Sequence, residues 1–317
     1  MRILKFGGKS LATLEKVQNI GKYIKKIYKK DKNIIIVVSA IGNTTDSLLA
    51  EAKEYGDIDQ HPRELDVLLS TGETKSAALL CILLNSIGVP AKSLLGFQLK
   101  ITTFGAHQNS RIAHIGKQPI LECFKHKQVV VVAGFQGINK NGDITTLGRG
   151  GSDTTACALS AVFDTPAEIY SDFDGVFCGD PRLMHYKKLK HLNYNTLHKL
   201  ALAGAKVIDH RAVAIAQKFN TPIISKASHQ PACSGTTISN LEDDVVAISS
   251  KNNLAEITIV FSNESKMKFI MKNVINGING VKLYNLTLQN NKISFIVEND
   301  KLDQILKILS KKLNLLK

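Results

Sequence analysis

Apolar runs and helical repeats alternate along most of the chain. Short apolar runs rich in branched residues predict buried strands at Ile3–Phe6, Asn33–Ser39, Ala91–Leu95, Val129–Ala133, Glu168–Ser171 and Ile223–Ser225. Between them, helical patterns occupy Leu11–Lys30, Thr45–Tyr55, Pro62–Gly88, Arg111–His126, Asp153–Phe163, Tyr194–Ala203 and His210–Phe219. This alternation predicts an α/β fold, with a mostly parallel sheet sandwiched by helices.

The pattern changes near residues 244–256, where the polar segment Ser249-Ser250-Lys251-Asn252-Asn253 predicts a linker. Beyond it the chain is expected to form a strand, a helix, a hairpin through Asn290-Asn291, and a second helix. These elements span Ile257–Phe261, Lys266–Asn276, Val281–Gln289, Lys292–Val297 and Leu302–Leu313. A length of 317 residues also suggests two domains, which we expect at 1–248 and 254–317.

The chain is basic, with a formal net charge of +14. Such a charge is compatible with nucleic acid or an anionic membrane as partner. The lysines, however, are scattered over predicted helix faces without interleaved aromatic residues, and no nucleic-acid-binding motif occurs. We therefore expect solvated faces and neither partner.

The cysteines and the apolar runs indicate where the protein resides. Its five cysteines are odd in number and lack Cys-x-x-Cys spacing, which predicts free thiols in a reducing compartment and no structural metal site. No signal peptide precedes Lys5, and no apolar run approaches the length of a membrane span. The cytoplasm is the expected location.

Two glycine-rich turns carry the candidate chemistry. One lies in Leu147-Gly148-Arg149-Gly150-Gly151-Ser152-Asp153, between the apolar run Val129–Ala133 and a predicted helix. A strand, a glycine turn and a helix start aim backbone N–H groups at an anion. Arg149 offers a bidentate fork for a carboxylate or phosphate, and Ser152 and Asp153 are candidate caps of the helix.

The second turn opens the chain as Ile3-Leu4-Lys5-Phe6-Gly7-Gly8-Lys9-Ser10. Lys5 ends a strand and supplies a point charge for phosphate oxygens. The spacing is that of neither a P-loop nor a dinucleotide-binding turn. Two such turns indicate two anionic ligands, or one long ligand held at both ends, beyond the carboxyl ends of the strands.

These motifs resemble the signatures of aspartate kinases, members of the amino-acid-kinase superfamily. The resemblance rests on Lys5–Ser10 and Gly148–Ala156, and on three further segments, Val38–Asp46, Leu69–Glu73 and Ser171–Arg182, followed by Gly204-Ala205-Lys206-Val207. The motifs keep the family's order over roughly three quarters of the chain. The implied reaction is ATP-dependent phosphorylation of the side-chain carboxylate of L-aspartate, the first step toward lysine (through diaminopimelate), threonine and methionine.

The resemblance also implies a nucleotide pocket. The acceptor carboxylate is already ionised at neutral pH, so the site needs in-line positioning and charge neutralisation rather than a general base. ATP, with Mg²⁺ bridging its phosphates, is assigned to Lys5, Phe6, Gly7, Gly8, Ser171, Asp172, Phe177, Arg182, Lys206 and Val207. Phe177 stands where the family usually has tyrosine, so a phenol hydrogen bond is missing there.

For the substrate, Arg149 is expected to clamp the α-carboxylate of aspartate and Glu73 to pair with its ammonium group. The remaining substrate residues are Ser39, Thr45, Gly150, Gly151 and Ser152. Lys5 and Asp153 form the catalytic pair, in which Asp153 orients Lys5 or the metal without moving a proton.

Each assignment has a plainer interpretation. Glu73 by position alone is a solvated helix glutamate, and Ser39, Thr45 and Asp153 are candidate helix caps. Lys206 is equally suited to complement a helix dipole. Lys9, where the family usually has threonine, receives no role.

The C-terminal order of elements resembles one ACT module without its last strand. Family members usually carry two such modules, and Ser262-Asn263-Glu264-Ser265 replaces the turn often found after the first strand. We expect weak or no inhibition by lysine and threonine, with a sensory and a purely subunit-joining role both open. ACT modules commonly pair, which favours a homodimer.

Other functions remain to be distinguished. The nearest is another carboxylate kinase of the superfamily, with a glutamate-type substrate, and more distant ones act on N-acetylglutamate, carbamate or UMP. Glu73 separates them, because an N-acetylated substrate or a nucleotide offers no ammonium group to pair with it. A degenerate kinase acting as a binding module is disfavoured by the intact Lys5, Arg149 and Asp153.

Overall fold

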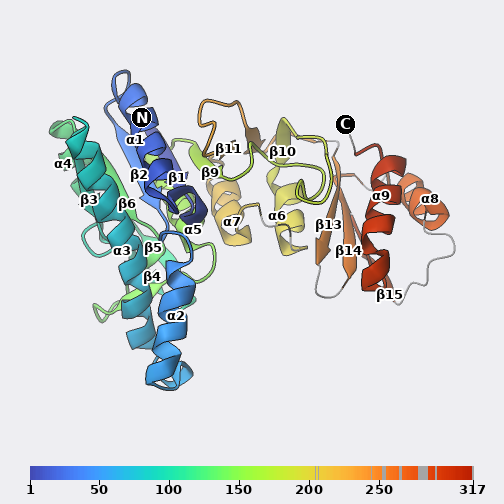
Figure 1. The fold of residues 1–317 in the computed structure, drawn as a ribbon, viewed down its shortest axis with the longest axis horizontal. Helices are drawn as coiled ribbons and strands as arrows, with labels where there is room; N and C mark the ends of the chain where they lie inside the picture. Colours follow the sequence, from blue (N-terminus) through green and yellow to red (C-terminus); the bar gives the residue numbers. More distant parts are fainter. Residues whose placement is uncertain are drawn as a thin grey trace. The chain divides into compact units, whose positions relative to one another are not determined.

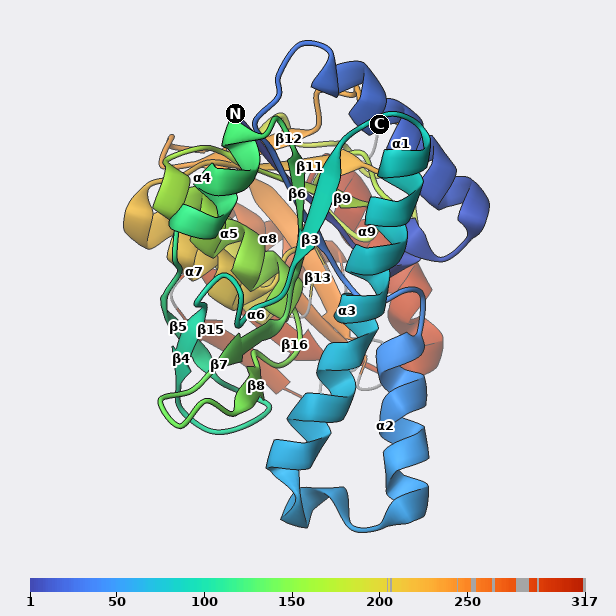
Figure 2. The same ribbon diagram turned by 90° about the vertical axis from the view of Figure 1, so that its left-hand side faces the viewer.

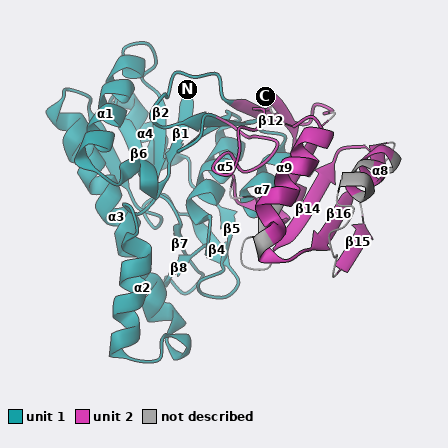
Figure 3. Cartoon of the chain, turned by 45° about the vertical axis from the view of Figure 1, so that its right-hand side comes forward, with its two compact units in different colours: residues 1–174, 211–235 teal, residues 175–210, 236–317 magenta. Residues whose placement is uncertain are grey.

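The structure, a computed structural model, describes residues 1–203, 205, 207–243, 245–251, 255–263, 266–277, 285–289 and 291–315. They form two units, residues 1–174 with 211–235 and residues 175–210 with 236–317 (Figure 3). This division differs from the predicted domains, because residues 175–210 and 236–248 pack with the C-terminal segment rather than with the N-terminal residues.

The first unit is built on a parallel sheet in the order β11-β9-β1-β2-β6-β3. Its strands are β1 (Arg2–Phe6), β2 (Ile34–Val38), β3 (Ala91–Leu94), β6 (Val129–Ala133), β9 (Ala167–Ser171) and β11 (Ile223–Ala227). Each predicted strand of this sheet is confirmed to within two residues at its ends. The α/β fold class is confirmed with them.

Helices cover both faces of this sheet (Figures 1 and 2). Leu4 and Ile36 pack with α1 (Leu14–Tyr28) and α3 (Pro62–Ser86). Ile3 and Val37 pack with α4 (Gln118–Lys125), α5 (Gly151–Phe163) and α7 (His210–Phe219). Because alternate residues of a strand face opposite sides, Lys5 lies on the face that α5 covers.

A second, small sheet in the order β5-β4-β7-β8 was not expected from the sequence. It contains β4 (Thr102–Phe104), β5 (Arg111–His114), β7 (Gln136–Ile138) and β8 (Ile144–Thr146). The helix predicted at Arg111–His126 is therefore wrong in its first part. Pro119 fits only the first turn of a helix, so α4 begins at Gln118.

The remaining elements of this unit are short helices and α2 (Thr44–Tyr55), with η1 at Gly8–Leu11 and η2 at Ile58–Gln60. The helix predicted from Leu11 begins at Leu14, because Thr13 accepts the N–H of Lys16 as its N-cap.

The helix α3 corrects one expectation about membranes. Among the described residues it alone is long and apolar enough to cross a bilayer by length and composition, so the expectation of no such run is wrong. Half of its apolar window is buried inside the structure, and it contacts β3, β6 and β8. Packing against these strands accounts for its composition.

The second unit contains a parallel pair, β10 (His191–Asn193) with β12 (Thr236–Ser239), and α6 (Tyr194–Leu202). Its antiparallel sheet has the order β13-β14-β16-β15. The members are β13 (Val246–Lys251), β14 (Glu256–Phe261), β15 (Asn285–Gln289) and β16 (Lys292–Ile296), with α8 (Met267–Gly277), η4 (Asn299–Lys301) and α9 (Leu302–Lys312).

The predicted linker is partly wrong, because Ser249, Ser250 and Lys251 lie in β13 and pair with β14. Asn252 and Asn253 lie outside the described residues, as do Asn290 of the predicted hairpin turn and Glu264-Ser265 of the turn after the first strand. The strand β13 pairs with β14 and forms one edge of the sheet. The predicted β-α-β-β-α order contained only three strands, so β13 is a fourth strand that the sequence did not predict.

Candidate active site

Lys5 and Asp153 bring the two glycine-rich turns together. Lys5 stands next to last in β1, and Asp153 lies in the first turn of α5. Lys5 Nζ is 2.6 Å from Asp153 Oδ1, and each residue is only 9% exposed. The carboxylate oxygen has no aligned hydrogen bond, so the contact is an ion pair. Lys5 is therefore not an exposed strand-end lysine.

The turn at Gly7-Gly8 packs against the segment that follows β2. A Cβ on Gly8 would lie 2.5 Å from the Ala40 carbonyl oxygen, so only glycine fits there. The Gly42 N–H donates to the Gly8 carbonyl at 2.9 Å, and the Ser39 N–H donates to the Phe6 carbonyl at 3.1 Å. The structure thus brings Ser39 beside the proposed phosphate-binding turn.

Thr45 lies in the first turn of α2, half-buried. The N-cap of α2 is Asn43, which makes no side-chain capping bond. The interpretation of Ser39 and Thr45 as caps of this helix is therefore wrong.

Glu73 lies on the buried side of α3 and is 4% exposed, which excludes a solvated helix glutamate. Its Oε1 accepts the Ala40 N–H at 2.9 Å, while Oε2 has no hydrogen-bond partner among the described residues. Burial raises the pKa of this carboxyl to about 7, opposed by the Ala40 N–H and by the charge of Lys5. A buried carboxylate oxygen without a partner favours a ligand that donates hydrogen bonds.

The turn around Arg149 uses left-handed backbone at Gly148 (φ 73°) and Gly150 (φ 69°). Gly150 is the N-cap of α5, and no side chain caps the helix. Ser152 and Asp153 were predicted as caps, but they occupy the second and third helical positions. Asp153 is free of that role because its carboxylate faces Lys5.

The side chain of Arg149 is exposed, and its backbone is fixed by a second arginine. The guanidinium of Arg211 donates to the carbonyl oxygens of Arg149 and Leu147, the latter at 2.5 Å. A Cβ on Gly151 would lie 2.8 Å from the ring of Phe135, so the turn packs closely on that ring.

Two of the residues predicted to bind the nucleotide, Ser171 and Asp172, lie at the C-terminal end of the neighbouring strand β9. Ser171 is the last residue of β9, which pairs directly with β1, and its carbonyl accepts the Ser228 N–H at 2.8 Å. Asp172 follows and is exposed, with its carboxylate 3.7 Å from Lys9 Nζ. Lys9, for which the sequence offered no role, therefore contacts one of the predicted nucleotide residues.

Three other predicted nucleotide residues, Phe177, Arg182 and Val207, lie in the second unit. Phe177 is half-buried and forms an isolated antiparallel backbone bridge with Lys188, and the Arg182 guanidinium donates to both carboxylate oxygens of Asp180. Val207 is half-buried. Gly204 and Lys206 lie outside the described residues.

Sequence reasoning missed Phe135 and Arg211, which shape the Arg149 turn, and also a buried carboxylate of α3, Asp66. Phe135 adopts φ 70°, which is unusual for an aromatic residue, and donates its N–H to Thr155 Oγ1 at 3.1 Å. Arg211 is distant in sequence from the turn that it holds, so no local pattern indicates it. Asp66 had a signal, since it interrupts the apolar side of a predicted helix seven residues before Glu73.

Comparison with known proteins shows the family of the chain. The Amino acid kinase family matches residues 1–224. The chain belongs to the amino acid kinase family. Its relatives there are aspartokinases, which confirms the resemblance noted in the sequence. The aspartokinase of Geobacillus stearothermophilus is 43% identical over 230 residues, covering 71% of this chain and 56% of the relative.

A second relative covers nearly the whole chain. The aspartokinase of Bacillus sp. (strain MGA3) is 34% identical over 335 residues, which is 99% of this chain and 79% of that protein. The chain nevertheless spans only a little more than half the length of most relatives it resembles, for example 54% of the aspartate kinase of Pseudomonas fluorescens.

Solved structures support the same fold. E. coli aspartokinase III, in complex with aspartate and ADP, superposes with a TM-score of 0.82 at 17% identity, covering 99% of this chain and 100% of that one. Aspartate kinase from Synechocystis superposes with a TM-score of 0.64 at 30% identity, covering 97% of this chain and 54% of that one. The first likeness shows the fold alone.

Proposed function

We propose that the protein is an aspartate kinase, which transfers the γ-phosphoryl group of ATP to the side-chain carboxylate of L-aspartate. The observation that carries this proposal is the contact between Lys5 and Asp153, 2.6 Å apart, which joins the glycine turn after β1 to the start of α5. A phosphate-binding turn and a carboxylate-binding turn at one edge of a sheet suit a kinase with a small acidic acceptor.

The protein binds the amino acid by its α-carboxylate and its ammonium group. Arg149 clamps the α-carboxylate, and the unpaired Oε2 of Glu73 accepts the ammonium group. Ser39, Thr45, Gly150, Gly151 and Ser152 complete this pocket. With a pKa of about 7, Glu73 is ionised at mildly alkaline pH, where it attracts a cation.

The end of β1 and the glycine turn that follows it bind the phosphates of the nucleotide. Lys5 neutralises the phosphates, together with the N–H groups of Gly7 and Gly8 beside Phe6. Asp153 fixes the ammonium group of Lys5 in place. Further nucleotide contacts are assigned to Ser171, Asp172, Phe177, Arg182, Lys206 and Val207.

Magnesium accompanies the nucleotide. Among the described residues, no group of three or more His, Cys, Asp or Glu side chains is arranged to hold a metal. Mg²⁺ commonly takes one or two carboxylates, several waters and substrate phosphates, so Asp153 and Asp172 at this edge are a sufficient set. When bound, it supplies charge neutralisation on the phosphate oxygens.

The wider role follows from the reaction. Phosphorylated aspartate leads toward lysine, through diaminopimelate, and toward threonine and methionine. We propose a cytoplasmic homodimer, with residues 254–317 as a single, shortened ACT-like module.

An acceptor panel tests the function. The enzyme, with ATP and Mg²⁺, is assayed by hydroxamate trapping on aspartate, glutamate and N-acetylglutamate, and by ADP release on UMP. We expect turnover with aspartate above the others. The variant Lys5→Met should lower kcat by roughly two to three decades, as for loss of a preorganised charge, and should still fold, with a lower Tm because the buried Asp153 carboxylate loses its partner.

Lys25→Met, an exposed lysine of α1, is the matched control and should keep full activity. Preference for UMP or N-acetylglutamate would reject the function, whereas near-normal kcat in Lys5→Met would remove only Lys5 from the mechanism.

A further inference from the structure

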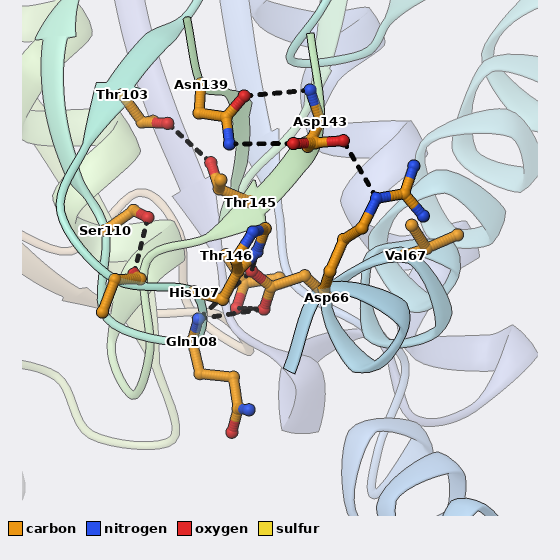
Figure 4. Close-up of polar contacts among 12 residues, drawn as sticks. Asp66, Val67, Thr103, His107, Gln108, Ser110, Asn139, Asp143, Thr145 and Thr146 are labelled. Atoms are coloured by element: carbon orange, nitrogen blue, oxygen red, sulfur yellow. Dashed lines mark hydrogen bonds and ion pairs between the residues drawn. The ribbon is translucent and has the colours of Figure 1, made fainter. Parts of the chain in front are cut away.

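A second buried carboxylate lies on the same helix as Glu73. Asp66 in α3 is 0% exposed. Its carboxylate accepts the Thr146 hydroxyl at 2.5 Å and the Gln108 N–H at 3.1 Å, and it lies 2.7 Å from His107 Nδ1 (Figure 4). An isolated carboxylate is costly to bury, so this set of partners must be in place when the protein folds.

The partners of Asp66 come from two other elements. His107 and Gln108 belong to the loop of residues 105–110 between β4 and β5, and Thr146 ends β8. The Ser110 N–H donates to the Thr146 carbonyl at 3.0 Å, which ties the loop to β8. Asp66 therefore fastens helix, loop and strand to one another.

The same loop supports the turn that carries Arg149. Thr146 is followed directly by Leu147, and the Gln108 carbonyl lies 2.7 Å from where a Cβ on Gly148 would stand. Asn109 Oδ1 accepts from Arg211 at 3.1 Å. That guanidinium also donates to the carbonyls of Leu147 and Arg149, so loop and turn share one clamp.

Spacing along α3 links this clamp to the rest of the substrate pocket. Asp66 and Glu73 are seven residues apart, close to two helical turns, and both are buried. The helix α3 thus carries both Glu73, which is proposed to bind the ammonium group, and Asp66, which contacts the loop and the strand next to the Arg149 turn.

We propose that Asp66, together with His107, is a positioning pair that holds Arg149 where it meets the α-carboxylate of the amino acid. The inference rests on the proposed function for its kinetic consequence, but the clamp itself is a property of the ligand-free chain. The hydrogen-bond partners of Asp66 are His107, Gln108 and Thr146, none of which is assigned to ATP, so Asp66 should act on amino-acid affinity and not on nucleotide affinity.

Steady-state kinetics test the consequence. Asp66→Asn keeps the shape but turns an acceptor into a donor facing Thr146 or His107. We expect the KM for aspartate to rise at least tenfold, with kcat and the KM for ATP within twofold of the unmodified enzyme. His107→Leu should act likewise. His107→Asn retains an N–H at the position of Nδ1 and should restore the KM for aspartate to within threefold.

Asp143→Asn is the matched control. Asp143 lies in the same region and is hydrogen-bonded to Arg63 and Asn139, and within the described part of the chain none of its hydrogen bonds or ion pairs joins it to the Arg149 turn (Figure 4). Its kinetic constants should stay within twofold. If Asp66→Asn leaves all constants unchanged, or shifts both KM values and kcat together, the positioning role is rejected.

Hydrogen exchange tests the clamp without substrate. In ligand-free Asp66→Asn, amide uptake should increase in residues 105–110 and 147–151 but not around Gly7-Gly8. Unchanged uptake overturns the proposal, even if aspartate is the substrate. Inactivity of the unmodified protein toward aspartate would reject the proposed function and leave exchange to decide the clamp. Should Asp66→Asn fail to fold, His107→Leu and Thr146→Val carry the same measurement.

Discussion

Three ionisable groups concentrate the chemistry of the site: Lys5, Asp153 and Glu73. Lys5 contacts Asp153 at 2.6 Å and also lowers the pKa of Glu73, which burial raises. One lysine thus acts on two carboxylates: it forms an ion pair with Asp153, and its charge lowers the pKa of Glu73.

The raised pKa of Glu73 predicts a pH dependence of stability. The folded carboxyl, with a pKa of about 7 against an ordinary 4.5, binds more protons than the unfolded one between these values. Stability should fall as the pH rises through this window and level off above it, by on the order of 3 kcal/mol. Urea unfolding of the ligand-free protein at several pH values measures the slope.

Glu73→Gln is the control for this dependence, because it keeps the Ala40 contact and removes the titration. The difference in unfolding free energy between the two proteins should change with pH only between about 4.5 and 7. A difference that stays flat across the window contradicts the assignment. In assays, the KM for aspartate should rise below pH 7 in the unmodified enzyme alone.

At this scale the sequence indicated the charged residues of the candidate site, and it did not indicate the residues that hold the Arg149 turn in place. Lys5, Arg149 and Asp153 stand in motifs whose order fixes their neighbours, and the structure brings Lys5 and Asp153 together. Arg211 and Phe135 act through backbone carbonyls and a positive φ, which leave no pattern in the sequence. The catalytic and binding roles of Lys5, Arg149 and Asp153 stay predictions.

Among the elements, α3 is placed by a close approach at Gly72. A Cβ on Gly72 would lie 2.8 Å from the Ala40 Cβ, next to the N–H that Glu73 accepts. Glycine inside a helix costs about 1 kcal/mol relative to alanine. The approach of α3 to residues 39–42 offsets that cost.

Two helical glycines form a matched pair for a test. Gly21→Ala in α1 meets only the flexible ends of Leu83 and Ile87, at 3.1 and 3.3 Å, and should change stability little or raise it by up to about 1 kcal/mol. Gly72→Ala meets Ala40 and should destabilise by about 1–3 kcal/mol. Urea midpoints at constant m-value compare them. Equal effects would show that α3 has room to move.

The elements that the sequence predicted are the long ones. Strands of the parallel sheet are apolar throughout because both faces are covered, which makes them easy to find. The strands β4, β7 and β8 have three residues each, too few to show an alternation. The alternation of apolar and polar residues over residues 111–114 is weak, so the sequence predicts them as part of the helix that follows.

At the scale of the whole molecule, the second unit joins predicted nucleotide residues to the C-terminal module. Cys178 and Tyr186 are buried in the same apolar cluster as Phe295 and Leu309. The Ser310 hydroxyl donates to the Tyr186 hydroxyl at 2.9 Å, and the Lys187 N–H donates to the Leu315 carbonyl at 2.9 Å. The segment around Phe177 and Arg182 therefore depends on α9 for support.

Two fully buried side chains test that dependence. Leu309→Ala in α9 and Ile120→Ala in α4 should each cost about 2–5 kcal/mol of stability. Only Leu309→Ala should raise the KM for ATP, several-fold, because only its cluster includes residues that flank Phe177 and Arg182. Activity is measured well below both Tm values. Equal KM values for ATP in the two variants would contradict the dependence.

The order in which the chain contributes to the second unit has a consequence for biosynthesis. Residues 175–210 emerge from the ribosome long before residues 302–315, yet both line one apolar cluster. At ordinary translation rates of about 5–20 residues per second, the earlier segment waits for several seconds with apolar side chains uncovered. A nascent polypeptide interrupted within that interval is thus a natural client for chaperones, and the segment around Phe177 and Arg182 gains its support only after α9 has been made.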